Sequence, residues 1–147
     1  MAAEIRVLAS GDESVLMNVA PEVFDNPVDP ELAREFLADP RHHIAVAIDD
    51  GQVVGFASGL HYVHPDKPPE LWINEVGVAP SHQRRGLAGA VLRALFDVAR
   101  AHRCTHAWVL TDRGNAPANA LYASLGGREG EEGLSEAMVG YAFDLHG

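Results

Sequence analysis

Apolar residues recur with a helical period in one long segment of the chain. They stand at intervals of four, four and three residues, at Leu87, Val91, Leu95 and Val98. This spacing places them on one face of an α-helix, so we predict a helix over residues 84–102. A second helix is predicted over 30–38, because Asp29 is a suitable N-cap and Pro30 occupies the first helical position.

Two further helices are predicted from capping signals. Asp12 or Ser14 can cap a helix over 13–24, unless Pro21 ends it early. The last predicted helix covers 115–125. Gly126 follows it as a C-cap residue, since glycine adopts the left-handed conformation at a helix end.

Strand patterns occupy the segments between the helices. Apolar alternation and β-formers predict strands over 5–9, 44–48, 53–63, 71–78, 105–111 and 137–145, with 105–111 buried. The sequence Asp49-Asp50-Gly51-Gln52 predicts a hairpin turn, because Asp and Gly tolerate positive φ. Strands interspersed with helices indicate a single α/β (α+β) domain over 1–147, with mixed strand pairing.

Composition narrows the class of protein. Of the 147 residues, 47% are hydrophobic and 22% are charged, as in an ordinary globular domain. The single cysteine excludes a disulfide framework and a cysteine-based zinc site. The first ten residues lack the apolar run of a signal peptide, and the longest nearly apolar stretch, 53–60, is too short to span a membrane. We therefore expect a soluble cytoplasmic protein.

The charge is unevenly distributed. The chain carries a formal net charge of −10, yet residues 83–103 contain five arginines and one aspartate, so this segment carries +4 and the remainder −14. An acidic chain argues against nucleic-acid binding. A basic segment in an acidic body suggests an anionic ligand near residue 85 and a cationic ligand elsewhere. The alternative is that the acids serve solubility and the arginines lie on a solvated helix face.

The start of the long helix has the features of a phosphate-binding site. A strand ends near Val78, a short polar turn follows, and the helix begins with small residues, Gly86, Ala88 and Gly89. Helix N-termini carry unpaired N–H groups and partial positive charge, and small residues let a pyrophosphate approach the backbone. The spacing matches neither the P-loop nor the dinucleotide fingerprint. The alternative is that these small residues only pack the helix against the sheet.

Two linked motifs resemble the GNAT superfamily of acetyl-CoA-dependent N-acetyltransferases. Residues 83–88, Gln-Arg-Arg-Gly-Leu-Ala, match the family pattern Gln/Arg-x-x-Gly-x-Gly/Ala, and 75–80 look like the strand before it. Residues 115–126 match the helix pattern Asn-x-x-Ala-x-x-Leu-Tyr-x-x-x-Gly. Gly127 departs from the family, which often has an aromatic residue there.

This resemblance implies a fold and a co-substrate. The expected fold is a mixed β-sheet whose fourth and fifth strands splay apart, with helices on both faces. The splayed strands would admit the pantetheine arm of acetyl-CoA, which pairs with backbone groups of the fourth strand, while the helix start takes the pyrophosphate. The implied cofactor-binding residues are Val76, Val78, Gln83, Arg84, Arg85, Gly86, Leu87, Ala88, Gly89 and Asn115.

The resemblance also implies two catalytic residues. Acetyl transfer requires a deprotonated amine and a proton for the departing CoA thiolate. Glu75 stands where the family carries a general base, acting directly or through water, and Tyr122 stands where it carries a general acid. The alternatives are that Glu75 pairs with a cation or a backbone amide and that Tyr122 is a packing residue.

The acceptor is a finer prediction. Around 24–27, 61–70 and 75–78 the chain looks most like small aminoglycoside 3-N-acetyltransferases, which implies a primary amine of an aminoglycoside as acceptor and a role in antibiotic resistance. Asp25, Glu75 and Asp112 are the predicted substrate-binding acids, and Asp29, Glu70 and the cluster at 129–136 are further candidates. The acidic body would attract such a polycation.

Other functions stay open. The acceptor could instead be another small amine, a polyamine, or a protein N-terminus or lysine, and the chain could be a non-catalytic acyl-CoA sensor. No nucleic-acid or membrane partner is expected, and a homodimer is an alternative to a monomer. We also predict no metal site, because His61 and His64 would lie on opposite faces of a strand and neither they nor His42-His43 have a cysteine or carboxylate to complete a site.

Overall fold

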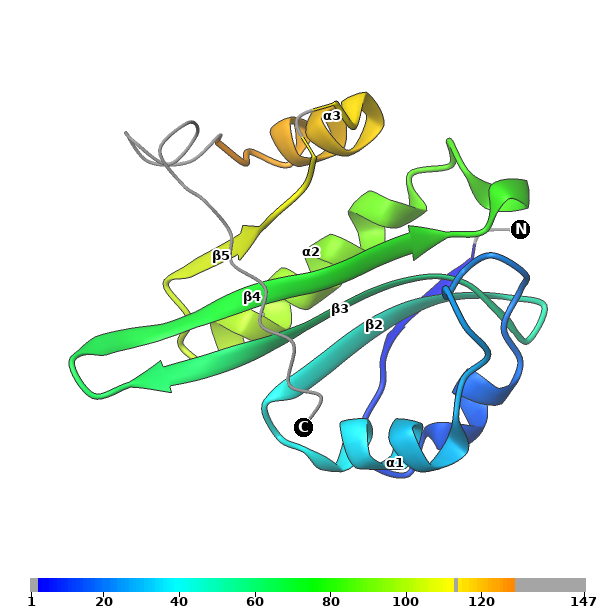
Figure 1. Ribbon diagram of the computed structural model, residues 1–147, viewed down its shortest axis with the longest axis horizontal. Helices are drawn as coiled ribbons and strands as arrows, with labels where there is room; N and C mark the ends of the chain where they lie inside the picture. Colours follow the sequence, from blue (N-terminus) through cyan, green and yellow to red (C-terminus); the bar gives the residue numbers. More distant parts are fainter. Residues whose placement is uncertain (1–2, 113, 129–147) are drawn as a thin grey trace, which may run out of the picture. The chain divides into compact units, whose positions relative to one another are not determined.

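The computed structural model describes residues 3–112 and 114–128, in two compact units, 1–110 and 111–147. The first unit contains a five-stranded sheet in the order β1-β2-β3-β4-β5 (Figure 1). Neighbouring strands are antiparallel except for β4 and β5, which are parallel. This confirms the predicted mixed sheet. The strands are β1 (Glu4–Val7), β2 (His42–Asp49), β3 (Gln52–His64), β4 (Lys67–Val78) and β5 (His106–Val109).

Helices cover both faces of this sheet, as predicted. The first unit contains η1 (Glu13–Met17), α1 (Pro30–Ala38), η2 (Pro80–His82) and α2 (Leu87–Ala101). His42 of β2 stacks on Phe36 of α1, and His43 lies against His102 at the end of α2. Successive residues of a strand point to opposite faces, so α1 and α2 pack on opposite faces of the sheet.

The core lies between α2 and the central strands. Val91, Leu92 and Leu95 of α2 are fully buried, as are Val53 and Leu71 of the sheet. These α2 residues include two positions of the predicted apolar face. Burying each leucine contributes about 1.5–3 kcal/mol relative to leaving it exposed. This packing fixes the first turn of α2 beside the end of β4.

The β2–β3 hairpin turn forms as predicted. Asp50 and Gly51 both have positive φ, 52° and 75°. Two central residues with positive φ match the right-handed twist of the flanking strands. The short turn sets the register of the hairpin, in which Asp49 pairs with Gln52.

Strand β4 separates from β5 beyond its first half. Their parallel pairing covers only Glu70 to Ile73 of β4, whereas β4 itself continues to Val78. The register against β3 also shifts there, because Ser58 pairs with Glu75 and Gly59 with Ile73, which leaves Asn74 as an extra residue in β4. Such a bulge bends and twists a strand. The pairing of the fourth and fifth strands is therefore confined to Glu70–Ile73, and it stops where β5 ends at Val109.

The predicted helix over 13–24 is wrong. Only Glu13–Met17 is helical, as a 3₁₀ turn. The chain then joins the sheet region: Val53 donates its N–H to the Asn18 carbonyl at 2.9 Å, and Ala20 donates to the Val53 carbonyl at 2.9 Å. Pairing with β3 replaces helical hydrogen bonds here, and Pro21 has no N–H with which to continue a helix.

Other boundaries also differ from the prediction, and β4 begins at Lys67 rather than at residue 71. Helix α2 begins at Leu87 rather than at residue 84, because Arg84 and Gly86 have φ of 65° and 76°, outside the helical region. Strand β5 is shorter than 105–111 and largely exposed rather than buried, with Trp108 43% exposed. As the edge strand of the described sheet, it has a neighbouring strand on one side only.

The second unit contains α3 (Ala116–Ser124). The side chain of Asn115 caps it by accepting a hydrogen bond from the Ala118 N–H at 3.1 Å. Gly126 follows with a φ of 87°, as a C-cap glycine should. The strand predicted over 137–145 and the acidic cluster at 129–136 lie outside the described residues. Within the described ranges, no helix is both long enough and apolar enough to cross a membrane.

Candidate active site

The start of α2 differs from the starts of α1 and α3. In α1 the Asp29 carboxylate accepts hydrogen bonds from the N–H groups of Glu31 and Leu32, and in α3 the Asn115 side chain does the same for Ala118. In α2 the N-cap is Gly86, and no side chain caps it. The first intrahelical bond runs from Ala90 N–H to the Gly86 carbonyl, so the preceding amides are available to an anion.

Two arginines flank this uncapped start. Arg84 and Arg85 are exposed, and neither forms an ion pair within residues 3–112 and 114–128. The left-handed backbone at Arg84 and Gly86 turns the chain sharply between η2 and α2. Gly86 is needed for its positive φ rather than for space, because a Cβ there would have no atom within 4 Å.

His82, which was not predicted to have a role, links the loop before α2 to the β2–β3 hairpin by hydrogen bonds. The His82 ring bonds Asp49 through Nε2 and Ser81 through Nδ1, both at 2.7 Å. The hydrogen bond with His82 lowers the pKa of Asp49. Gln83 adds a bond from its side-chain amide to the Val78 carbonyl at 3.3 Å. His82 immediately precedes the motif at 83–88, but its hydrogen-bond partner Asp49 lies 33 residues away in the sequence.

The free half of β4 supplies an unpaired backbone edge. Beyond Ile73 no described strand pairs with β4 on its β5 side, so the backbone of 74–78 faces away from β3 without a strand partner there. Val76 and Val78, predicted to bind pantetheine, lie in this half and are partly exposed. An extended ligand with amide groups can pair with such an edge.

A pocket of about 340 Å³ lies on the α1 face of the same strand. Its walls include Asp25 from the loop before α1, Leu32 and Phe36 from α1, and Phe56 and Glu75 from the sheet. Two of the predicted substrate-binding acids, Asp25 and Glu75, thus meet in one pocket. The extra residue of the bulge, Asn74, also lines it.

The fold holds Asp25 against Glu75 through close packing. Phe24 stacks on Phe56 with ring centroids 4.2 Å apart. Gly77 lies beneath this loop, where an added Cβ would come within 2.7 Å of the Val23 carbonyl oxygen. Glycine at this position therefore lets the loop approach β4 closely.

The carboxyl pair has perturbed acid–base properties. Burial raises the pKa of Glu75, and the nearby carboxyl of Asp25 raises that pKa further. A carboxyl whose pKa is raised toward neutrality is a better general base than an ordinary glutamate. The arrangement can therefore hold a cationic amine and accept a proton from it.

The other candidate acids have structural partners. Asp29 caps α1, accepting from Glu31 N–H at 2.8 Å. Glu70 accepts a hydrogen bond of 2.6 Å from the Tyr62 hydroxyl, which in turn accepts one of 3.1 Å from Trp108. The sequence pointed to both by charge alone, and the structure gives each a bond within the fold.

Asp112, Asn115 and Tyr122 belong to the second unit. The Asp112 carbonyl accepts hydrogen bonds from Asn115 N–H and from the Asn119 side chain. Asn115 acts there as the N-cap of α3, and burial raises the pKa of Tyr122. Their predicted roles toward acceptor, cofactor and thiolate stay predictions.

Curated proteins of related sequence are acetyltransferases. The chain is 36% identical over 104 residues to the N-alpha-acetyltransferase RimI of Mycobacterium tuberculosis, a match covering 71% of this chain and 63% of that protein. It is 33% identical over 89 residues to the streptothricin acetyltransferase of Streptomyces lavendulae, covering 60% of this chain and 45% of that protein. The chain thus matches less than two thirds of the length of these relatives.

Solved structures share the fold along nearly the whole chain. An aminoglycoside acetyltransferase from an uncultured soil metagenomic sample superposes with a TM-score of 0.78 at 22% identity, covering 99% of both chains. A ribosomal-protein-alanine N-acetyltransferase from Brucella melitensis gives 0.72 at 19% identity, covering 97% of this chain and 99% of the other. The model of the acetyltransferase (GNAT) family matches residues 14–126. This chain therefore belongs to the GNAT family of acetyltransferases.

Proposed function

We propose that the protein transfers the acetyl group of acetyl-CoA to a primary amine, by direct attack within a ternary complex. One observation carries this proposal: β4 leads at its end into an uncapped, arginine-flanked helix start, and it presents Glu75 to a carboxylate-lined pocket. One strand thereby connects an anion site with an amine site. Its unpaired edge between them suits the pantetheine arm.

The cofactor's charge is matched by the α2 start. The amides of Leu87, Ala88 and Gly89 receive the pyrophosphate, and Arg84 and Arg85 add positive charge. Gln83 keeps the loop against β4 through its bond to Val78. Asn115, as the cap of α3, supports the second family motif.

The chemistry balances with one base and one acid. The acceptor enters as an ammonium ion and is held by Asp25 and Glu75. Glu75 takes a proton, directly or through water, and the freed amine forms a bond to the thioester carbonyl carbon. When the C–S bond breaks, Tyr122 gives its proton to the CoA thiolate. The acetylated nitrogen then loses its second proton, directly or through water, to the Tyr122 phenolate, and Glu75 releases its proton to solvent, so the products are a neutral amide and the CoA thiol.

We propose an aminoglycoside as the acceptor, acetylated at its 3-amino group as the sequence resemblance implies. The acidic pocket and the net charge of −10 favour a polycation. Similar solved structures include an aminoglycoside acetyltransferase in complex with sisomicin and AAC(6′)-Iy in complex with a bisubstrate analogue. These names support the acceptor class, and the position acetylated has to be read from the product.

A second acceptor class is favoured by a specific observation. The relative with 36% identity is named an N-alpha-acetyltransferase, so a protein N-terminal amine is the competing acceptor. An N-terminal amine is also a cation at neutral pH and would meet the same Asp25–Glu75 pair.

An acceptor screen tests the proposal. Release of the CoA thiol is followed with aminoglycosides, polyamines and N-terminal peptides at equal concentration, and NMR of the product locates the acetyl group. We expect the highest kcat/KM with an aminoglycoside. Turnover confined to peptides would overturn the aminoglycoside assignment, and tight acetyl-CoA binding without turnover of any amine would identify a sensor.

A further inference from the structure

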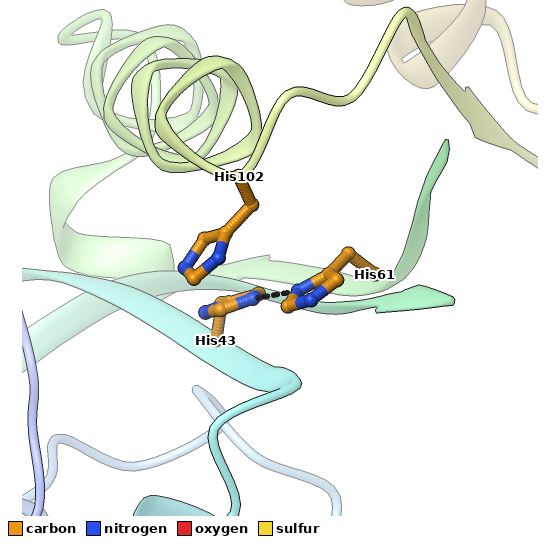
Figure 2. A group of neighbouring side chains, drawn as sticks. All are labelled: His43, His61 and His102. Carbon is orange, nitrogen blue, oxygen red and sulfur yellow. Dashed lines mark hydrogen bonds between the residues drawn. The ribbon is translucent and has the colours of Figure 1, made fainter. Parts of the chain in front are cut away.

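Three histidines distant in sequence meet on the α2 face of the sheet. His43 comes from β2, His61 from β3, and His102 directly follows α2 (Figure 2). One ring nitrogen of each lies within 4.8 Å of the others. His43 Nε2 and His61 Nδ1 are 2.7 Å apart in a hydrogen bond, and His102 lies over both rings, with centroid distances of 4.9 and 4.4 Å.

The sheet register explains the first two positions. His43 pairs with Gly59 across the antiparallel β2–β3 ladder, and His61 is two residues further along β3, on the same face. Diagonal neighbours of this kind lie about 7–8 Å apart at Cα, within reach of long side chains. His102 is the C-cap of α2, and its backbone N–H donates hydrogen bonds to carbonyls of the last turn. These bonds fix the position of the His102 backbone, from which the ring extends.

Two of the three rings, His43 and His61, favour the neutral form that a metal binds. A metal binds neutral imidazole, so protonated histidines cannot be ligands. Burial, followed by the neighbouring His61 and His102, lowers the pKa of His43 to about 4. Burial and His102 also lower the pKa of His61. At neutral pH these two rings therefore present lone pairs rather than charge.

We propose that His43, His61 and His102 bind a divalent transition-metal ion of the Zn²⁺ type, with water as the fourth ligand. Tetrahedral bonds of about 2.0–2.1 Å would place the ligand nitrogens about 3.3 Å apart. The 2.7 Å between His43 Nε2 and His61 Nδ1 must therefore widen slightly, and ligand nitrogens that lie up to 4.8 Å apart must come closer together. His102 is exposed and can make the larger movement.

Besides this movement, metal binding requires a tautomeric change. The proton shared between His43 Nε2 and His61 Nδ1 moves to the other nitrogen of its ring, so both facing nitrogens offer lone pairs and no proton leaves the protein. The burial of His43 and His61 keeps these two ligands in place before the ion arrives. The exposure of His102 leaves an entry path from solvent.

This site is separate from the proposed acetyl-transfer site. The pocket with Glu75 is on the α1 face of the sheet, whereas the three histidines are on the α2 face. The histidines also adjoin the C-terminal end of α2, whose 15 residues make it about 22 Å long, and the uncapped start is at its other end. The ion would therefore join β2, β3 and α2 and stabilise the fold, without taking part in the acetyl transfer.

The test uses Zn²⁺ alone with the metal-free full chain, carrying no histidine tag. Calorimetry should show one Zn²⁺ per chain, and Zn²⁺ should raise the melting temperature. His102→Ala should weaken binding at least about 100-fold, more than loss of an outer-sphere partner does. His61→Gln should do the same, and His64→Ala, which removes an exposed histidine near the end of the same strand, should leave binding unchanged.

X-ray absorption of the wild-type Zn²⁺ complex provides a measurement without any variant. It should show three imidazole nitrogens at about 2.0–2.1 Å and a light-atom ligand. Absence of Zn²⁺ binding at a large excess of metal would overturn the proposal and leave a hydrogen-bonded histidine stack. Fewer than three imidazole ligands, unchanged affinity in His102→Ala, or an equal loss in His64→Ala would also overturn it.

Discussion

Glu75 shows how a single residue depends on its surroundings. On an exposed strand it would be an ordinary solvated acid, but partial burial and, secondarily, Asp25 raise its pKa. The resemblance to a family identified the position, whereas Asp25 as its partner follows from the packing of Phe24 on Phe56. The acid–base properties of Glu75 therefore depend on its neighbour Asp25 as well as on Glu75 itself.

Replacing Glu75 by Gln removes the proton acceptor and keeps the shape of the side chain. We expect kcat to fall by about 10²–10⁴-fold, the usual contribution of a general base, with unchanged acetyl-CoA affinity. Steady-state kinetics and calorimetry measure the two quantities. A rise in KM at unchanged kcat would instead assign Glu75 to binding the cation.

Stability supplies the control for this variant. A carboxyl whose pKa is raised on folding favours the native state fully below its unfolded pKa of about 4.3, and this contribution is lost as pH rises through the raised value. Gln does not ionise, so Glu75→Gln should melt at pH 7 no lower than the wild type. Lost activity would then not result from unfolding.

If Glu75 is the general base, Asp25 influences the pH at which it is active. The base is active when deprotonated, so kcat/KM should rise with pH through the pKa of Glu75. Asp25→Asn removes a negative charge that raises this pKa, and we expect the ascending limb to move to lower pH. The pH–rate profile with one acceptor measures the shift, and Asp66→Asn, at an exposed turn, is the control. An unmoved limb would show that Asp25 does not act on the base.

Tyr122 is the test of the leaving-group step. Tyr122→Phe keeps the ring in α3 and removes only the hydroxyl. If Tyr122 protonates the CoA thiolate, turnover should fall by about 10²–10⁴-fold at an unchanged melting temperature. Wild-type turnover in this variant would make Tyr122 a packing residue.

At the scale of elements, features set by neighbouring residues could be predicted from the sequence, whereas features set by pairing between distant residues could not. The hairpin turn, the Asp29 cap and the helix over 115–125 with its Gly126 C-cap were predicted because the deciding atoms lie within a few residues. The helix over 13–24 failed because backbone pairing with Val53, far along the chain, replaced it. His82 was missed because Asp49 lies 33 residues away. The proximity of His102 to His43 and His61 was not predicted for the same reason, because the three lie far apart in the sequence.

The start of α2 can be tested as an element. Gly86→Val places a β-branched residue at a φ of 76°, where L-residues are strained by about 1–2 kcal/mol, and puts methyl groups beside the proposed pyrophosphate. We expect acetyl-CoA affinity to fall at least about tenfold, equivalent to 1.4 kcal/mol. Gly11→Val, at a φ of 99° and also with open space, is the control for backbone strain alone. Calorimetric affinity within about twofold of the wild type would place the pyrophosphate elsewhere.

At the scale of the whole molecule, charge separates the two substrates. The +4 segment at 83–103 contains the proposed anion site, and the rest of the chain carries −14. Attraction of a polycationic acceptor should weaken as salt rises from about 0.1 M to about 1 M, where the screening length falls from about 10 Å to about 3 Å. We expect KM for an aminoglycoside to rise several-fold at constant kcat. The KM for a monoamine should rise less with salt. An equal rise in KM for both acceptors would contradict long-range electrostatic attraction of the polycation.

If acetyl-CoA binds at the uncapped start of α2 as proposed, its pyrophosphate completes the hydrogen bonding of this helix. The side chains of Asp29 and Asn115 accept hydrogen bonds from the first N–H groups of α1 and α3. The first N–H groups of α2 have no such side-chain acceptor and can bind an external anion instead. A ligand held at 100 times its Kd stabilises the native state by about 2.7 kcal/mol. The lifetime of the folded chain would therefore follow the acyl-CoA supply, and a cell depleted of acetyl-CoA would hold a less durable enzyme as well as an idle one.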